Sequence, residues 1–215
     1  SSAASDVYKR QEINGQGPHI DSSHIEQLMN RLRRLESGDV LVLAGSIPAG
    51  ISDNIYKDIM DMLKDKGVQI VVDATSRLLT NVLEYNPFFI KPNQHELGDI
   101  FNVTLNTQEE VIPYALELKK MGAVNVCVSM GGKGAILVAD DGNVYKAKAP
   151  DGILKNSVGA GDSLVAGFLS GWIEKKDYEY AFRKGVATGS ASAFSERLAT
   201  NGEVNDLIGK VTIIR

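Results

Sequence analysis

Short, continuously apolar runs alternate with longer amphipathic segments along this chain. Val40–Ala44 and residues 68–72 are runs of the first kind, which are typical of strands buried on both faces of a sheet. Residues 20–35 and 53–66 carry apolar side chains at helical spacing, so we expect a helix in each. Strands that alternate with helices predict an α/β fold, in which helices flank a mostly parallel sheet in three α/β/α layers.

The same alternation continues toward the end of the sequence. Further helices are predicted in residues 77–85, 109–121, 162–174 and 178–194, and further strands in 88–90, 124–129 and 211–214. The apolar runs 135–139 and 144–147 flank Asp-Asp-Gly-Asn, a hairpin signal that predicts antiparallel strands at one edge. Ligands of such open sheets bind beyond the carboxyl ends of the strands. Polar or glycine-rich clusters follow predicted strands four times in this sequence, at residues 45–46, 73–75, 91–93 and 129–134.

The bulk properties argue against several classes of protein. The chain has 215 residues, a formal net charge of -4 and one cysteine, Cys127, which lies in an apolar run. A general nucleic-acid binder would need a basic face. The sequence shows no apolar run as long as a membrane span and no signal peptide, so we expect a cytoplasmic protein that binds neither nucleic acid nor membrane. The histidines have no partners at zinc-ligand spacing.

Residues 156–163, Asn-Ser-Val-Gly-Ala-Gly-Asp-Ser, carry the sharpest functional signal. Gly159, Ala160 and Gly161 are small enough for their amide groups to approach a ligand closely, and an apolar helix follows from Asp162. A helix N-terminus has free amide groups and partial positive charge, so the segment predicts an anion site. The alternative is structural, with Asp162 acting only as the N-cap of the helix.

A second glycine-rich loop follows the predicted strand 124–129. It consists of Ser129, Met130, Gly131, Gly132, Lys133 and Gly134. Three glycines and a lysine at a strand end suit a nucleotide with its phosphates, although the loop lacks the spacing of a Walker loop. The alternative is a plain glycine-rich connection between strands.

Two more polar clusters follow predicted strands. Asn93 and Glu96 are three residues apart, and oxygen ligands at this spacing suit Mg²⁺, often through water. Their alternative is a capping box, in which Asn93 caps a helix and Glu96 occupies its third position. Ser46, in the turn after Val40–Ala44, could offer its hydroxyl to a polar substrate, and its alternative is ordinary turn chemistry.

Together these segments resemble the phosphofructokinase B group of ribokinase-like sugar kinases. Residues 156–168 are similar to the C-terminal signature of that group, and residues 91–96 to its Asn-x-x-Glu magnesium motif. Residues 44–50 resemble its substrate loop and residues 129–134 its ATP loop. The motifs occur in family order over about residues 12–198, and they look most like the branch that acts on fructose 1-phosphate.

The resemblance implies roles for the reacting groups. Asp162 would take the proton from the acceptor hydroxyl, and the amide groups of Gly159, Ala160 and Gly161 would hold the charge on the transferring phosphoryl group. Asp162 and Ser46 would also contact the sugar.

The resemblance also implies two ligands besides the sugar. Residues 129–134, with Gly161 and Asp162, would bind ATP, and residues 183–194 would line the binding site of its adenine. Asn93 and Glu96 would organise Mg²⁺ through water.

The implied reaction is ATP-dependent phosphoryl transfer to a hydroxyl of a sugar phosphate. Fructose 1-phosphate, giving fructose 1,6-bisphosphate, is the expected acceptor, and tagatose 6-phosphate is the alternative. A non-catalytic nucleotide-binding fragment is the alternative of another class. A dinucleotide dehydrogenase is not favoured, because no Gly-x-Gly-x-x-Gly follows a strand and opens a helix.

The N-terminal residues are interpreted separately. Residues 1–11 have neither helical nor strand periodicity and are expected to be a non-native or disordered tail. Residues 12–18 resemble the last segment of a lid, and residues 12–215 the C-terminal portion of the kinase domain. We therefore expect the N-terminal strands and most of the lid to be missing, and the isolated chain to be inactive. In the full-length protein, a homodimer through the lid is expected.

Overall fold

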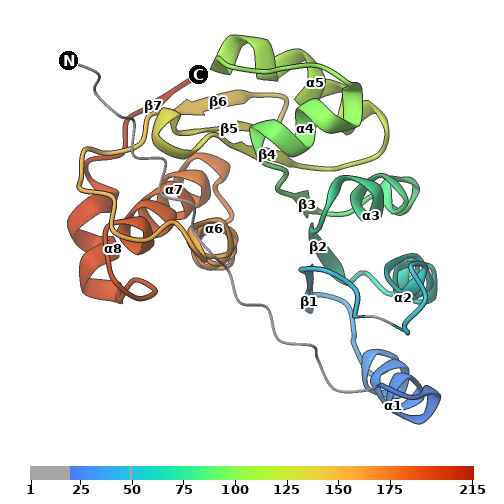
Figure 1. Ribbon diagram of the computed structural model, residues 1–215. Coiled ribbons are helices and arrows are strands. Elements are labelled where there is room, and N and C mark those ends of the chain that lie inside the picture. The colour runs from blue at the N-terminus through green and yellow to red at the C-terminus, as the bar shows by residue number, and fades with distance from the viewer. Residues whose placement is uncertain (1–19, 49) are drawn as a thin grey trace, which may run out of the picture.

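A computed structural model of the chain describes residues 20–48 and 50–215, in which seven strands form one sheet with helices on both faces (Figure 1). The predicted tail 1–11 and lid segment 12–18 lie outside the described residues. The strands are β1 (Val40–Ala44), β2 (Gln69–Asp73), β3 (Phe89–Ile90), β4 (Val126–Ser129), β5 (Ala135–Val138), β6 (Val144–Ala147) and β7 (Ile213–Ile214). The helices are α1 (Ser22–Leu32), α2 (Ile55–Leu63), α3 (Ser76–Thr80), α4 (Gln94–Phe101), α5 (Gln108–Lys120), α6 (Ala160–Lys175), α7 (Tyr178–Ala193) and α8 (Asn201–Ile208), with 3₁₀ turns η1 (Leu83–Tyr85) and η2 (Gly131–Lys133).

The strands lie side by side in the order of the sequence. Strands β1 to β4 are parallel to one another, and each pairing from β4 to β7 is antiparallel. The predicted α/β fold and the predicted β5–β6 hairpin are therefore confirmed, with the antiparallel strands at the β7 edge. Because β1 to β4 are parallel, their carboxyl ends all lie along one edge of the sheet.

Each face of the sheet packs against its own set of helices. Helices α1 to α5 cover one face, and α6 to α8 cover the other (Figure 1). The alternation within β4 shows the division: Val126 and Val128 pack with the first set, while Cys127 packs with the second. Cys127 is fully buried, as its apolar surroundings in the sequence predict, and burial raises the pKa of its thiol to about 12. The three predicted layers are thus confirmed.

The sequence-based picture of β1 was wrong in one respect. Its continuous apolar run predicts burial on both faces, yet Val42 is 43% exposed and Ala44 is exposed as well. Strand β1 is the first strand of the sheet, and Val40, on the same face as Val42, is only partly buried against the cluster that includes α6 to α8. An apolar run therefore gives the strand but does not tell whether both of its faces are covered.

Some helix limits also differ from the prediction. The segment 77–85 divides into α3 and η1, and α6 begins two residues before Asp162. The sequence did not predict α8, although its Thr200 and Glu203 form a capping box. Among the described residues, no helix has the length and apolar character needed to cross a lipid bilayer.

Candidate active site

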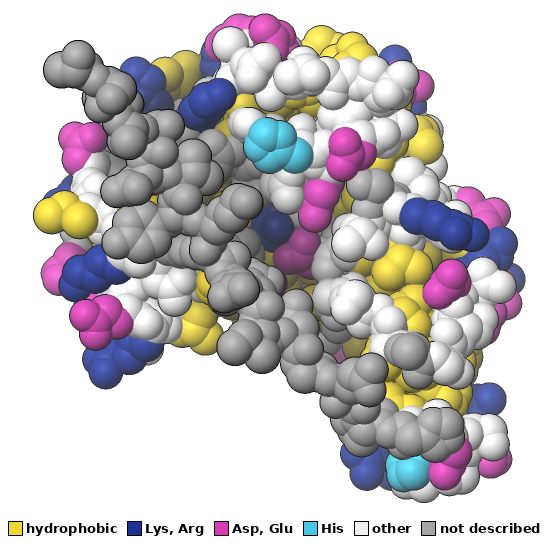
Figure 2. All heavy atoms as spheres, viewed as in Figure 1, with side chains coloured by type: hydrophobic (Ala, Val, Ile, Leu, Met, Phe, Trp, Pro, Cys, Tyr) yellow, Lys and Arg dark blue, Asp and Glu magenta, His cyan; other side chains and the backbone are white. Residues whose placement is uncertain are grey.

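The four polar clusters predicted to follow strands meet along one edge of the sheet. Gly45 donates its amide hydrogen to the carbonyl oxygen of Asp73, at 3.0 Å, which ties the end of β1 to the end of β2. Asn93 forms a parallel bridge with Ser129, linking the segment after β3 to the end of β4. Figure 2 shows acidic and basic side chains side by side in the hollow near the centre of this face.

Asp162 lies in the first turn of α6 and is exposed. The N-cap of this helix is Gly159, with a φ of 75°, which has no side chain to cap the first turn, and the amide of Ala160 donates to the carbonyl oxygen of Ser157, at 3.3 Å. The structural alternative for Asp162 is therefore wrong, because the residue is the third of the helix and not its N-cap. Uncapped amide groups at a helix N-terminus favour an anion, which is the chemistry that the sequence predicted here.

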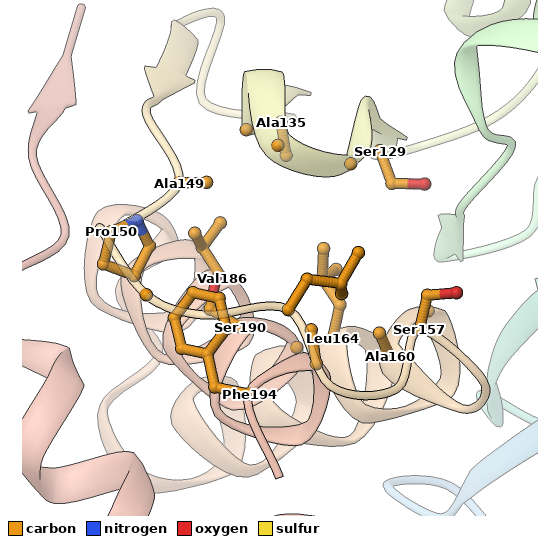
Figure 3. Close-up of a pocket in the computed structure, with 18 of the residues that line it drawn as sticks. Ser129, Ala135, Ala149, Pro150, Ser157, Ala160, Leu164, Val186, Ser190 and Phe194 are labelled. Carbon is orange, nitrogen blue, oxygen red and sulfur yellow. The ribbon is translucent and has the colours of Figure 1, made fainter. Parts of the chain in front are cut away.

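A cavity of about 520 Å³ separates the loop after β4 from helices α6 and α7. Figure 3 shows Ser129 and Ala135 on one side and Leu164, Ser190 and Phe194 on the other. The lining also includes Gly131, Gly132, Gly134, Ala149, Pro150, Asp151, Gly152, Leu154, Ser157, Ala160, Gly161, Val186, Gly189 and Ala193. A mostly apolar cavity of this size that ends at a helix N-terminus suits a nucleotide, with its base inside and its phosphates at the helix.

Three residues predicted near the nucleotide direct their side chains elsewhere. Met130 is 5% exposed and packs in the core between the sheet and α1 to α5. The Nζ of Lys133 donates to the carbonyl oxygen of Asn106, at 2.7 Å. The guanidinium of Arg183 donates to the carbonyl oxygen of Val211 and to Glu179. The loop after β4 therefore faces the cavity with backbone and small side chains.

Asn93 and Glu96 form a capping box at the start of α4. The Oδ1 of Asn93 accepts from the amides of His95 and Glu96, both at 2.9 Å, and Asn93 donates its amide hydrogen to Oε2 of Glu96, at 2.8 Å. The structure thus contains the alternative that the sequence left open. A capping box fixes both side chains at the rim and does not by itself exclude a hydrated metal ion beside them.

Ser46 is exposed in the turn after β1, at the same rim. Tyr56, a residue that the sequence analysis did not select, holds this turn: its hydroxyl donates to the carbonyl oxygen of Ala44, at 2.9 Å. Burial, followed by the charge of Asp73, raises the pKa of the Tyr56 phenol, so the phenol stays a neutral donor. The role of Tyr56 in holding the turn is visible only from this hydrogen bond to the end of β1.

A buried ion pair lies beneath the rim, between members of two of the predicted clusters, and no local sequence pattern predicts this pairing. Nζ of Lys91 is 3.2 Å from Oδ1 of Asp73, with 7% and 14% of the two side chains exposed. Burial raises the pKa of Asp73, the ammonium of Lys91 opposes this shift, and the charges of Asp162 and Glu96 add to it. Four ionisable groups are thus gathered where the strand ends meet α6.

Several known proteins are similar to this chain in sequence. Residues 2–203 match the model of the pfkB family carbohydrate kinases. The chain belongs to the pfkB family of carbohydrate kinases. It is 44% identical over 204 residues to a 1-phosphofructokinase of Bacillus subtilis, covering 95% of this chain and 67% of that protein. It is 30% identical to a D-tagatose-1-phosphate kinase of Bacillus licheniformis, covering 94% of this chain and 66% of that protein.

Solved pfkB family structures agree with the fold. Phosphofructokinase-2 of Escherichia coli, solved with substrates and products, superposes with a TM-score of 0.85 at 29% identity, covering 91% of this chain and 64% of that one. The ribokinase-like fold implied by the sequence motifs is therefore confirmed. This chain spans about two thirds of the length of the relatives that it matches.

Proposed function

We propose that this chain carries the nucleotide-binding and catalytic part of an ATP-dependent sugar-phosphate kinase. The observation that supports the proposal most directly is the position of Asp162. Its exposed carboxylate lies in the first turn of α6, whose Ala160 and Gly161 also line the cavity. A proton acceptor and an anion site therefore occupy the same helix end, as transfer of a phosphoryl group to a hydroxyl requires.

ATP would lie in the cavity with its base between Ala135 and Val186 and its phosphates toward Gly131 and the start of α6. Phosphoryl transfer depends mainly on positioning and on stabilisation of charge, with little covalent work for the protein. The amide groups of Gly159, Ala160 and Gly161 would hold the charge of the transferring group. Asp162 would accept the proton of the sugar hydroxyl as that oxygen attacks.

Asn93 and Glu96 are the residues that would hold Mg²⁺, through its water ligands. Their donor set consists of oxygen atoms, which Mg²⁺ prefers, and the capping box holds both side chains at the rim beside Ser129. When bound there, the ion would neutralise part of the phosphate charge.

Fructose 1-phosphate is the acceptor that we propose, with fructose 1,6-bisphosphate as the product. Two relatives named 1-phosphofructokinase, at 44% and 32% identity, support this choice. Relatives named D-tagatose-1-phosphate kinase and tagatose-6-phosphate kinase, at 30% and 31% identity, keep tagatose phosphates as the second candidate. Ser46 would contact the sugar, and comparing kcat/KM for the sugar phosphates decides between them.

The proposal also covers the cellular compartment of the enzyme and its assembly. We place it in the cytoplasm, where a reducing environment suits its single thiol, Cys127. Phosphofructokinase-2 of Escherichia coli has been solved as a tetramer. This relative supports self-association of the whole protein, for which we propose a homodimer through the lid.

The decisive experiment changes Asp162→Asn in the full-length protein, with Asp206→Asn, at an exposed residue of α8, as the matched control. Phosphate transfer from labelled ATP to fructose 1-phosphate and MgATP affinity are measured for each variant. Loss of a positioned base should slow transfer by about 10²–10⁴-fold while MgATP still binds. Near-normal turnover of Asp162→Asn refutes the role of this residue. ATP binding by the unaltered chain without transfer to any sugar phosphate favours a non-catalytic nucleotide-binding fragment.

A further inference from the structure

The buried ion pair of Lys91 and Asp73 calls for an explanation beyond stability. Both side chains leave the ends of neighbouring strands, and both are largely removed from water. Taking two charges out of water costs about as much as their attraction returns, and apolar residues of similar shape often stabilise such a position better. The pair therefore points to a use for the charge at this place.

The ammonium of Lys91 lies against the first turn of α6. A Cβ atom built on Gly161 would be 3.1 Å from Nζ of Lys91 and 3.5 Å from its Cε, so the absence of a side chain at 161 leaves room for the lysine. A helix N-terminus carries partial positive charge and repels an ammonium group. The two positive features are brought together here, and an anion bound between them would satisfy both.

Asp73 is the group that holds the ammonium at this unfavourable place. The same cluster contains competing carboxylates, because the charges of Asp162 and Glu96 both act on Asp73. Oε2 of Glu96 accepts the amide hydrogen of Asn93, whereas Asp162 is exposed and follows Gly161 directly. Without Asp73, the ammonium would be drawn toward Asp162.

From this geometry we infer that Asp73 is a positioning residue of the kinase reaction, which acts by holding the ammonium of Lys91 at the N-terminus of α6. There the ammonium meets the terminal phosphate of the nucleotide and stays apart from the proposed base, Asp162. The inference rests on the proposed function, because it assigns the anion at α6 to ATP. Asp73 itself does not touch the substrate and acts through Lys91.

The test is a double-mutant cycle on the 215-residue chain. Asp73→Asn, Lys91→Met and the combination of both are titrated with MgATP and with MgADP by calorimetry. Each single change should weaken MgATP binding by about 10-fold or more, the effect of losing one charge-assisted hydrogen bond. MgADP, which lacks the terminal phosphate, should be affected less. The combination should bind no more weakly than Lys91→Met alone, because both changes remove the same contact.

Two further variants separate positioning from folding. Asp61→Asn breaks the exposed pair of Asp61 and Lys64, whose charged atoms are 3.0 Å apart on α2, and should leave both nucleotide affinities unchanged. Asp73→Leu with Lys91→Met replaces the buried pair by apolar groups. It should keep the thermal midpoint of the unaltered chain and bind MgATP as weakly as Lys91→Met.

Three results would overturn the inference. The first is additive effects of Asp73→Asn and Lys91→Met, and the second is an Asp73→Asn variant whose ratio of MgATP to MgADP affinity is unchanged. The third is an apolar double variant that binds MgATP as tightly as the unaltered chain, and this measurement decides the matter if Asp73→Asn alone fails to fold. If the unaltered chain binds neither MgATP nor MgADP, the proposed function itself fails. If the chain binds both nucleotides but the effects of the two substitutions are additive, only the role of Asp73 fails.

Discussion

Gly134 allows a sharp test of the nucleotide loop. It joins η2 to β5 with a φ of 91° and a ψ of -139°, a conformation open almost only to glycine. A Cβ atom at this position would lie 2.0 Å from the carbonyl oxygen of Ala147, which belongs to the neighbouring strand β6. Because that oxygen is part of the backbone, Gly134→Ala must move the loop away from β6.

The cost of Gly134→Ala follows from the contacts that this movement breaks. The backbone conformation alone costs about 1–3 kcal/mol for alanine. Met130 donates its amide hydrogen to the carbonyl oxygen of Gly134, and Nε2 of Gln108 donates to the carbonyl oxygen of Lys133 in the same loop, each at 2.9 Å. Losing both hydrogen bonds adds about 1–3 kcal/mol, so the free energy of unfolding should fall by about 2–6 kcal/mol.

Gly132→Ala is the matched control in the same loop, because a Cβ atom there would have no heavy atom within 4 Å. Urea denaturation gives the free energy of unfolding of each variant, and calorimetry gives its affinity for MgATP. We expect Gly134→Ala to lose both stability and nucleotide affinity, and Gly132→Ala to keep its stability. Equal stability of the two variants would refute the close approach of Gly134 to β6.

Two further predictions concern ionisable groups. Hydrogen bonds from the backbone and side chain of Thr200 lower the pKa of Glu203 from 4.5 to about 2, so its contribution to stability is present above pH 4.5 and is lost as the pH falls toward 2. In urea denaturation near neutral pH, Glu203→Gln should therefore have a lower free energy of unfolding than the unaltered chain, and this difference should shrink as the pH falls. A difference that stays constant with pH would contradict the role of these hydrogen bonds. Lys133→Met should leave MgATP affinity unchanged in calorimetry, because Nζ of Lys133 bonds to Asn106, and a large loss of affinity would show that this lysine turns toward the phosphates.

Local signals in the sequence were sufficient for the fold and for part of the site. Apolar runs and helical spacing are local patterns that indicate the type of each element, so the order of strands and helices could be predicted. The segment from Gly159 to Asp162 could be selected because small residues before an apolar helix are a local pattern. Parallel strands then bring Asn93 and Ser129 to the same edge, and the structure shows them bridged.

The remaining features depend on contacts between distant parts of the chain. The pairing of Lys91 with Asp73 arises only when β2 and β3 lie side by side, and neither residue has a local pattern that reveals it. The side chains of Met130 and Lys133 were assigned to ATP because the sequence does not show which way a side chain points. Met130 in fact fills the core, and Lys133 bonds to Asn106.

The packing of α6 against α7 explains why the cavity lies where it does. A Cβ atom on Gly189 would be 2.9 Å from the carbonyl oxygen of Ala160, and one on Gly185 would be 2.9 Å from that of Leu164. Two helices can come this close only where side chains are absent. Gly189 therefore holds the first turn of α6 against the part of α7 that lines the cavity. The glycines of α7 thus help to place the anion-binding end of α6 beside the nucleotide, although they carry no reacting group.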